Sequence, residues 1–113
     1  MKKYDFNIPK HWKINKHKFY DLNLETYFSI PFEERNHFVL LEDIAQFSCK
    51  TSVGNLTMDL GWYPEENEAG AYTLLLIKDF DWDNPVAIFQ SRNGDEIAKT
   101  IQVWFEKYKN LKS

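Results

Sequence analysis

Three aspartates that alternate with two aromatic residues form the segment of the chain most suggestive of chemistry, KDFDWDNP at positions 78–85. In an extended conformation the three carboxylates share one face and the two rings share the other. The five residues are Asp79, Phe80, Asp81, Trp82 and Asp83. A calcium-binding EF-hand loop starts with such carboxylates, but it also needs Gly at its sixth position and Glu at its twelfth. Asn84 and Gln90 occupy those positions, so we expect no metal site and interpret the segment as an acidic loop anchored by its tryptophan.

A second acidic and aromatic segment is GWYPEENEAGAY at positions 61–72. Aromatic rings give contact area at low entropic cost, and carboxylates pair with Arg or Lys of a partner, so this combination favours protein recognition. The alternative is that Trp62 and Tyr72 belong to the core and that the glutamates only solubilise a loop. We expect the two segments to lie at the same end of a sheet. Together they supply the candidate partner-binding residues Tyr63, Glu65, Glu66, Glu68, Asp79, Asp81, Trp82 and Asp83.

Catalytic chemistry finds no support in the sequence. Cys49 is the one cysteine and has no histidine near it along the chain, which favours a buried, inert thiol. The three histidines lack metal-ligand spacing, and phosphate-binding and hydrolase motifs are absent. With only four glycines, loops that cradle phosphates are hard to build. We expect no catalytic residues, no metal and no cofactor.

The segment Lys10 to Tyr20 interleaves lysines with Trp12, Phe19 and Tyr20, as proteins that bind single-stranded nucleic acids do. An alternative function is therefore a nucleic-acid or small-ligand binding module that uses this segment. The sequence pI of about 5.6 argues against nucleic acid, because such proteins normally present a dominant basic face.

The modest net charge of −3 conceals a block pattern. Positions 21–96 hold fifteen acidic residues against four basic ones, a net charge of −11, whereas both ends of the chain are basic. Such a pattern creates a local field suited to a basic partner, although a solvated surface explains it equally well.

The chain of 113 residues fits a single domain spanning positions 1–113, and its aromatic content of 17% suffices for a core. No signal peptide or membrane span is recognisable, and a lone cysteine excludes an internal disulfide. We therefore expect a cytoplasmic protein that does not interact with membranes.

The elements that must position these residues are clearest at the C-terminus. Apolar residues recur there at helical spacing, which predicts an amphipathic helix over positions 94–110. They are Ile97, Ile101, Trp104, Phe105 and Tyr108. Asn93 with Glu96 three positions later resembles a capping box. We expect Trp104 to be buried on the apolar stripe.

Period-two alternation in Leu56 to Tyr63 predicts a strand with one buried face, and PEENEAG links it to a second strand at Ala71 to Lys78. The second strand is apolar on both faces, which predicts a covering on each. Ile44 to Thr51 and Val86 to Gln90 are predicted to be the flanking strands. The predicted fold is α+β, an antiparallel sheet of about four strands with the C-terminal helix packed on one face.

The pattern is less decisive before position 44. Positions 32–43 follow Pro31 and favour a short helix, although FVLL suits a strand equally well. The first 30 residues are too aromatic to be a disordered tail and are expected to pack over the sheet.

The stretch from Leu56 to Glu106 resembles small bacterial immunity proteins, the cognate inhibitors of polymorphic and contact-dependent growth-inhibition toxins. The resemblance rests on GWYPE at 61–65, Gly70, Tyr72 and DWDNP at 81–85, and it does not extend to positions 1–50. It implies a cytosolic inhibitor that binds the C-terminal domain of one toxin, often a basic nuclease. The eight candidate residues are then expected to contact that toxin. Immunity proteins differ widely in fold, so the resemblance implies no particular architecture.

Overall fold

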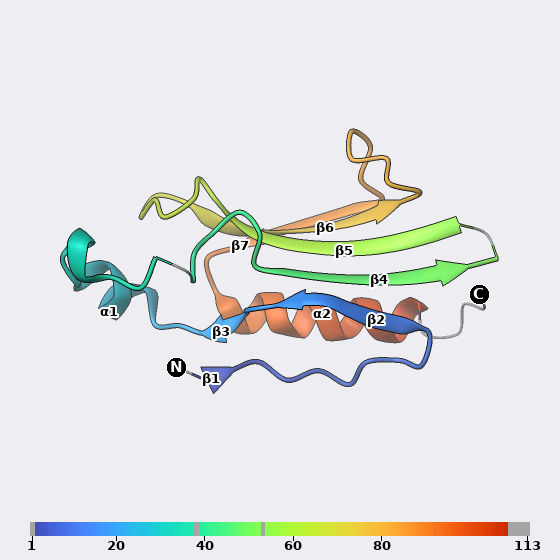
Figure 1. The fold of residues 1–113 in the computed structure, drawn as a ribbon, viewed down its shortest axis with the longest axis horizontal. Coiled ribbons are helices and arrows are strands. Elements are labelled where there is room, and N and C mark those ends of the chain that lie inside the picture. Colours follow the sequence, from blue (N-terminus) through green and yellow to red (C-terminus); the bar gives the residue numbers. More distant parts are fainter. Residues whose placement is uncertain (1, 38, 53, 109–113) are drawn as a thin grey trace.

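The computed structural model describes residues 2–37, 39–52 and 54–108. At its centre lies a five-stranded antiparallel sheet with the strand order β2-β4-β5-β6-β7 (Figure 1). The strands are β2 (Trp12–His17), β4 (Ala45–Thr51), β5 (Gly54–Tyr63), β6 (Ala71–Lys78) and β7 (Ala87–Ser91). One long helix, α2 (Gly94–Tyr108), lies along one face of this sheet. The α+β class and the C-terminal helix on the sheet are confirmed, and the sheet has one strand more than predicted.

The smaller elements come from the first third of the chain. β1 (Lys2–Lys3) pairs with β3 (Tyr20–Asp21) as a separate two-stranded sheet. A short helix, α1 (Leu24–Ser29), begins where the Asn23 side chain accepts a hydrogen bond from the N–H of Thr26. A single 3-10 turn, η1 (Phe32–Glu34), follows. Among the described residues, no helix has the length and apolar character needed to cross a membrane.

Strands β4 to β7 form a meander in which each strand pairs with its neighbours along the chain. Residues that face α2 alternate with residues that face away, as the period of two requires. Leu60, for example, lies opposite Ala45 on β4 and Leu74 on β6, and all three are fully buried. The four predicted strands are therefore confirmed.

Helix α2 buries one stripe against the sheet. Ile97, Ile101 and Phe105 have no exposed surface, whereas Trp104 is only partly buried at the margin of the core. The expectation that Trp104 would be core is therefore wrong, because its position on the helix directs it to the edge of the stripe. Of the predicted range 94–110, the structure confirms Gly94 to Tyr108, and the last two positions lie outside the described residues.

The start of α2 is capped, but not by a reciprocal capping box. Asn93 Oδ1 accepts hydrogen bonds from the N–H groups of Asp95 and Glu96, at 2.9 and 3.3 Å. The Glu96 carboxylate accepts a hydrogen bond from the Ser91 hydroxyl, and that hydroxyl accepts one from the Asn93 N–H. Ser91 thus takes the place that Glu96 would hold in a capping box.

The N-terminal segment supplies the fifth strand and covers part of α2. β2 pairs with β4, so that Trp12 lies opposite Cys49 in the core, with a bulge at Asn15. Residues 4–11 run beside α2 in Figure 1, and Asn7 exchanges two backbone hydrogen bonds with the Gln102 side chain. The expectation that this segment would pack over the sheet is therefore corrected, because β2 joins the sheet as an edge strand and Asn7 binds α2.

Residues 32–43 form less helix than predicted. Only the η1 turn is helical, and the chain from Val39 to Asp43 is irregular. Its backbone instead pairs with β5 and the following loop, since Leu41 and Leu40 carbonyls accept the N–H groups of Trp62 and Glu66. Phe38, within the FVLL run, lies outside the described residues. Long-range pairing therefore replaces the local helix.

The face of the sheet opposite α2, called here the open face, is covered only in part. The loop of residues 79–86 between β6 and β7 rises over this side in Figure 1. Ile77 on this face is fully buried. The second covering predicted for the apolar strand is therefore this loop.

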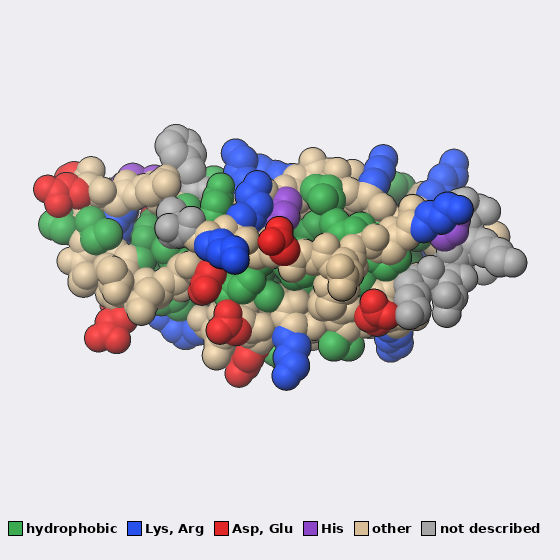
Figure 2. Space-filling view, turned by 90° about the horizontal axis from the view of Figure 1, so that it is seen from below, with side chains coloured by type: hydrophobic (Ala, Val, Ile, Leu, Met, Phe, Trp, Pro, Cys, Tyr) green, Lys and Arg blue, Asp and Glu red, His purple; other side chains and the backbone are tan. Residues whose placement is uncertain are grey.

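Charged side chains are unevenly spread around the other side of the molecule. Figure 2, seen from below, shows Lys and Arg gathered along one long edge, with both signs interspersed along the opposite edge. The exposed Lys13 and Lys18 of the N-terminal half belong to the basic end of the sequence pattern. The acids of the candidate binding surface, described in the next subsection, belong to the acidic middle block at positions 21–96.

Candidate protein-binding surface

The two acidic segments singled out in the sequence lie at opposite ends of β6. Residues 64–70 join β5 to β6, and residues 79–86 join β6 to β7. Because successive loops of an antiparallel meander alternate between its ends, the eight residues of β6 separate them by about 25 Å. The expectation that both would share one sheet end is therefore wrong.

The open face of the sheet spans the distance between these two loops. Cross-strand pairing places one row of side chains along it: Gln46, Asp59, Leu75 and Ile88 on β4 to β7. Their neighbours in sequence, such as Met58 and Leu74, are fully buried on the α2 side. The open face thus carries a carboxylate beside two apolar side chains, of which Ile88 is 59% exposed.

Asp59 is the most unusual group on this face. Burial raises the pKa of its carboxyl above the usual aspartate range, the Gln46 hydrogen bond opposes this shift, and the nearby Asp43 charge adds to it. The Gln46 amide donates to Asp59 Oδ1 at a long 3.4 Å. Partial burial of a charge with so little compensation costs folding stability, and perturbed groups of this kind gather at functional sites.

Two further acids, together with Asp59, lie close to Tyr63. Glu42 and Asp43 belong to the irregular segment that crosses β5 at Gly61, where a Cβ atom would come within 2.1 Å of the Glu42 carbonyl oxygen. Tyr63 donates its hydroxyl hydrogen bond to the same carbonyl at 3.1 Å and remains 38% exposed. Lys16 neutralises Asp43 through a 2.7 Å ion pair. Burial and the charges of Asp59, Glu42 and Asp43 raise the pKa of the Tyr63 phenol.

The other end of the open face is a groove of about 360 Å³ under the 79–86 loop. Phe80 and Trp82 form one side of it and are 61% and 45% exposed. Its floor comes from β2, β4 and β5, with Lys13, Asn15, Gln46, Ser48, Cys49, Lys50, Asn55 and Thr57. Trp82 is therefore not anchored in the core but presents a large ring beside the sheet.

The three aspartates of the 79–86 loop do not share one face. The chain turns at Asp79 and Phe80, both with φ near +55° (52° and 61°), so the extended geometry assumed for the segment is wrong. Asp79 Oδ1 accepts the N–H of Asn55 at 2.9 Å, a structural role. Asp81 and Asp83 remain exposed. No group of three or more potential metal ligands occurs among the described residues.

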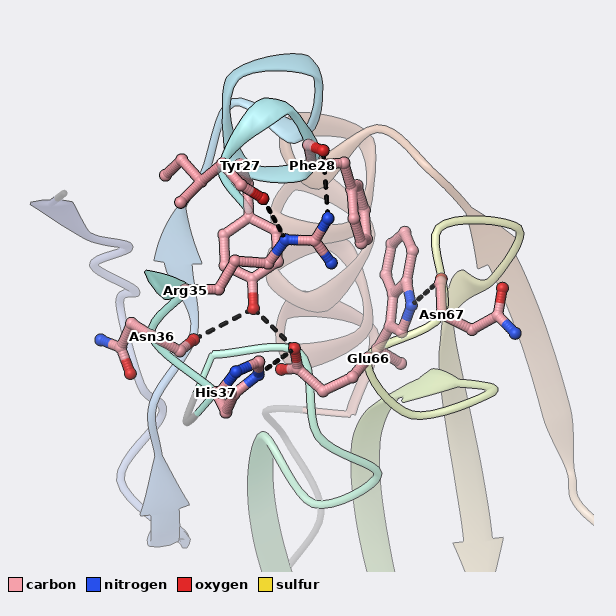
Figure 3. Close-up of polar contacts among 9 residues, drawn as sticks. Tyr27, Phe28, Arg35, Asn36, His37, Glu66 and Asn67 are labelled. Atoms are coloured by element: carbon pink, nitrogen blue, oxygen red, sulfur yellow. Dashed lines mark hydrogen bonds and ion pairs between the residues drawn. The ribbon is translucent and has the colours of Figure 1, made fainter. Parts of the chain in front are cut away.

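Glu66 has an internal role instead of a surface role. Its Oε2 accepts a 2.7 Å hydrogen bond from the Tyr27 hydroxyl and lies 3.0 Å from His37 Nδ1 (Figure 3). The Glu66 side chain is only 14% exposed. The network joins the 64–70 loop to α1 and to the segment after η1. Of the predicted toxin-contacting glutamates, only Glu65 and Glu68 are exposed.

Arg35 stabilises the same region, in which α1 and the segment after η1 meet the 64–70 loop. Its guanidinium donates to the carbonyls of Ile30 and Phe28, at 2.8 and 3.1 Å, and stacks near the Phe28 and Phe32 rings. Figure 3 shows Arg35 beside Tyr27, whose hydroxyl reaches Glu66. This region is a structural joint that fixes the 64–70 loop.

We expect Glu66→Ala to lower the free energy of unfolding by about 1–3 kcal/mol, because it removes the carboxylate that binds the His37 ring and leaves the Tyr27 hydroxyl only the Asn36 carbonyl as an acceptor. The matched control is Glu65→Ala, which changes an exposed neighbour and should stay within about 0.5 kcal/mol of the parent. Urea denaturation of the three proteins measures the difference. Equal midpoints for both variants would contradict the structural role of Glu66.

The structure buries Trp62, Tyr72 and Cys49, three residues discussed in the sequence analysis. Trp62 and Tyr72 are buried, so the alternative that they belong to the core is correct, and Trp62 Nε1 donates to the Asn67 carbonyl at 2.8 Å. Cys49 is buried in β4, and burial raises the pKa of its thiol. A raised pKa disfavours the thiolate that a nucleophile needs.

Sequence reasoning missed Glu42, Asp43 and Asp59, the acids that the structure places beside Tyr63. The alternation in β5 carried a usable signal for Asp59, which is the charged residue at an outward position between Met58 and Leu60. Nothing local marked Glu42 and Asp43, because only the crossing at Gly61 brings them to the open face.

Comparison with known proteins found no matching family model, no matching curated protein and no matching solved structure. The fold and the surface define an α+β domain with a five-stranded antiparallel sheet. Helix α2 covers one face of this sheet, and the open face carries Asp59 and exposed aromatic rings.

Proposed function

We propose that this protein is a cytosolic binding protein whose open face takes a basic protein partner, and that it neutralises this partner. The resemblance to immunity proteins suggests that the partner is the C-terminal domain of a cognate toxin. In this proposal the protein is an inhibitor and not an enzyme, and it needs no cofactor.

The observation that carries the proposal is the half-buried carboxyl of Asp59 beside Glu42 and Asp43. Of these three acids, Asp43 has a described cationic partner, Lys16. A Lys or Arg of a bound protein would compensate the charge of Asp59 in a setting where a hydrogen-bonded ion pair is stronger than in water. A carboxylate that destabilises the free domain thus gains its compensation in a complex.

Exposed rings at both ends of the open face support the same function. Tyr63 lies at one end, and Phe80 and Trp82 lie at the other. Large aromatic side chains carry much of the binding energy of protein interfaces, and a polar, charged surround sets the choice of partner. Exposed acids at both ends add a field that attracts a basic protein, namely Glu65, Glu68, Asp81 and Asp83.

The alternative of a nucleic-acid or small-ligand module loses its main support. Trp12 and Phe19 are 5% and 1% exposed, so these rings of the Lys10–Tyr20 segment pack in the core and do not offer a stacking surface for bases. Lys13 and Lys50 do line the groove beside Trp82. A titration of the tryptophan fluorescence with a short single-stranded oligonucleotide, in the parent and in Trp82→Phe, separates the two functions, since the inhibitor proposal expects no saturable change in either protein.

The proposal is tested by expressing the toxin domain encoded beside this gene, with and without this protein. We expect growth to be restored and a complex to be isolated from the cells. Absence of both protection and complex would overturn the proposed function.

Asp59→Asn provides a sharper test, because it should raise stability while weakening binding. The raised pKa means that the folded state holds the Asp59 proton more tightly than the unfolded state, so the carboxylate lowers stability above the aspartate pKa range. We expect a higher melting temperature at pH 7 and no gain at pH 3, where Asp59 is protonated. Asp5→Asn, a control at an exposed acid in the segment beside α2, should change neither quantity by much. Asp59→Asn with unchanged affinity for the toxin would remove Asp59 from the interface.

A further inference from the structure

The two edges of the five-stranded sheet are protected very differently. The edge strand β2 carries Lys13 and Lys16, and its register with β4 shifts between Ile14 and Lys16. Lysines and bulges at an edge are the devices by which proteins prevent a further strand from pairing there. The β2 edge is therefore closed to strand addition.

The opposite edge strand, β7, has none of these devices. Its five residues, AIFQS, are uncharged, and they pair with β6 in an unbroken register from Ala87 to Ser91. On its other side β7 pairs with no strand of the described part of the chain. Alternate backbone N–H and C=O groups of such a strand point to the open side, ready to pair with another chain.

Exposed apolar side chains accompany this free edge. Ile88 is 59% exposed, and Val86, immediately before the strand, is 53% exposed. Ile88 also ends the row of side chains that includes Asp59 on the open face. A strand added to β7 would therefore extend the open face and stay continuous with the surface proposed to bind the partner.

The charges beside β7 select the kind of strand that fits. Asp81 and Asp83 precede it, and Asp95 and Glu96 follow it, all exposed. The cation between them, Arg92, is directed away, since its Nη1 donates to the carbonyls of Glu68 and Gly70 and its guanidinium lies 5.4 Å from the Trp62 ring centroid. Both flanks of β7 are therefore acidic.

This charge distribution argues against pairing of β7 with a second copy of itself. An antiparallel β7 pair related by twofold symmetry brings the acids before the strand in one copy towards the acids after it in the other. Like charges placed opposite each other destabilise a strand pair. A basic strand from a different protein meets attraction at both ends instead.

We infer that β7 is the edge to which a basic strand of the partner adds, so that the complex contains a continuous sheet of six strands. This inference rests on the proposed function, because it takes the basic partner from there. Main-chain hydrogen bonds to β7 would supply affinity, and Ile88 together with the flanking acids would supply specificity.

The test measures hydrogen–deuterium exchange of the intact protein, alone and in complex with the toxin domain encoded beside its gene. We expect amide exchange within residues 87–91 to slow at least tenfold in the complex, since added hydrogen bonds protect the edge-facing N–H groups. Exchange in residues 12–17 of the closed edge should not change. A complex without protection of residues 87–91 would overturn the inference and leave the proposed function standing.

Two matched variants test the same point independently. Ile88→Lys places a charge on the free edge, and Ile14→Lys places one on the closed edge, at an isoleucine of similar exposure, 59% against 51%. We expect Ile88→Lys to weaken toxin binding at least tenfold and Ile14→Lys by less than twofold, with both proteins folded by circular dichroism. Equal affinities for the two variants would overturn strand addition at β7. Failure of the unaltered protein to bind the toxin domain would instead overturn the proposed function, and with it the basic partner assumed here.

Discussion

Phe105→Ala is expected to lower the free energy of unfolding by about 3–5 kcal/mol, the usual cost of emptying a large buried aromatic site. Phe105 has no exposed surface, and its ring meets those of Phe47 and Trp12 edge to face at centroid distances of 5.2 and 5.3 Å. It joins α2 to β4 and β2, so its loss leaves a cavity among three elements. The measurement is the urea midpoint, with the slope checked for two-state behaviour.

Trp104→Ala and Val103→Ala are the controls for this prediction. Trp104 is partly buried at the margin of the core, and Val103 is 56% exposed. We expect an intermediate loss for Trp104 and a change within about 0.5 kcal/mol for Val103. A loss for Trp104 equal to that for Phe105 would mean that the apolar stripe of α2 is wider than the structure indicates.

Reversal of two exposed acids at either end of the open face is expected to slow association with a basic toxin domain by roughly tenfold at low salt, because steering depends on the summed field. The two variants are Glu65→Lys with Glu68→Lys, and Asp81→Lys with Asp83→Lys. Their association rates should also depend less on salt than that of the parent. Stopped-flow association at two salt concentrations measures both effects.

The control for charge reversal keeps the same change in net charge but places it on the α2 side. Asp5→Lys with Glu106→Lys changes two exposed acids, one in the segment beside α2 and one on α2 itself. We expect a much smaller change in association rate. If all three pairs slow association equally, only the net charge matters, and the open face would have no special role in the encounter.

Local pattern alone determined a large part of the fold. Helix α2 was predictable from its period of 3.6 and β5 from its period of two, whereas β6 was predictable as a short apolar run that follows a polar turn. Antiparallel pairing of chain neighbours follows from the short connections between the strands. The exposure of Glu65, Glu68, Asp81 and Asp83 was also predictable from local sequence, because these acids lie in polar connections between strands.

Tertiary structure decided what depends on contacts between distant parts of the chain. The pairing of β2 with β4 places Trp12 opposite Cys49, and no short-range sequence pattern predicts this pairing. Glu66 resembled its exposed neighbours in sequence, but Tyr27 and His37 bind its carboxylate and make it part of the interior. Hydrogen bonding to distant partners, and not residue type, separates a structural carboxylate from a surface one.

The candidate surface shows the same division between sequence and tertiary structure. Residue types and spacing indicated an acidic and aromatic protein, because those properties are carried by single segments. Residue types and spacing did not predict where the surface lies, because successive loops alternate between the ends of the sheet and place the two predicted segments at opposite ends of β6. Only the crossing at Gly61 brings Glu42 and Asp43 beside Asp59 and Tyr63, and only the strand order leaves β7 as an open edge.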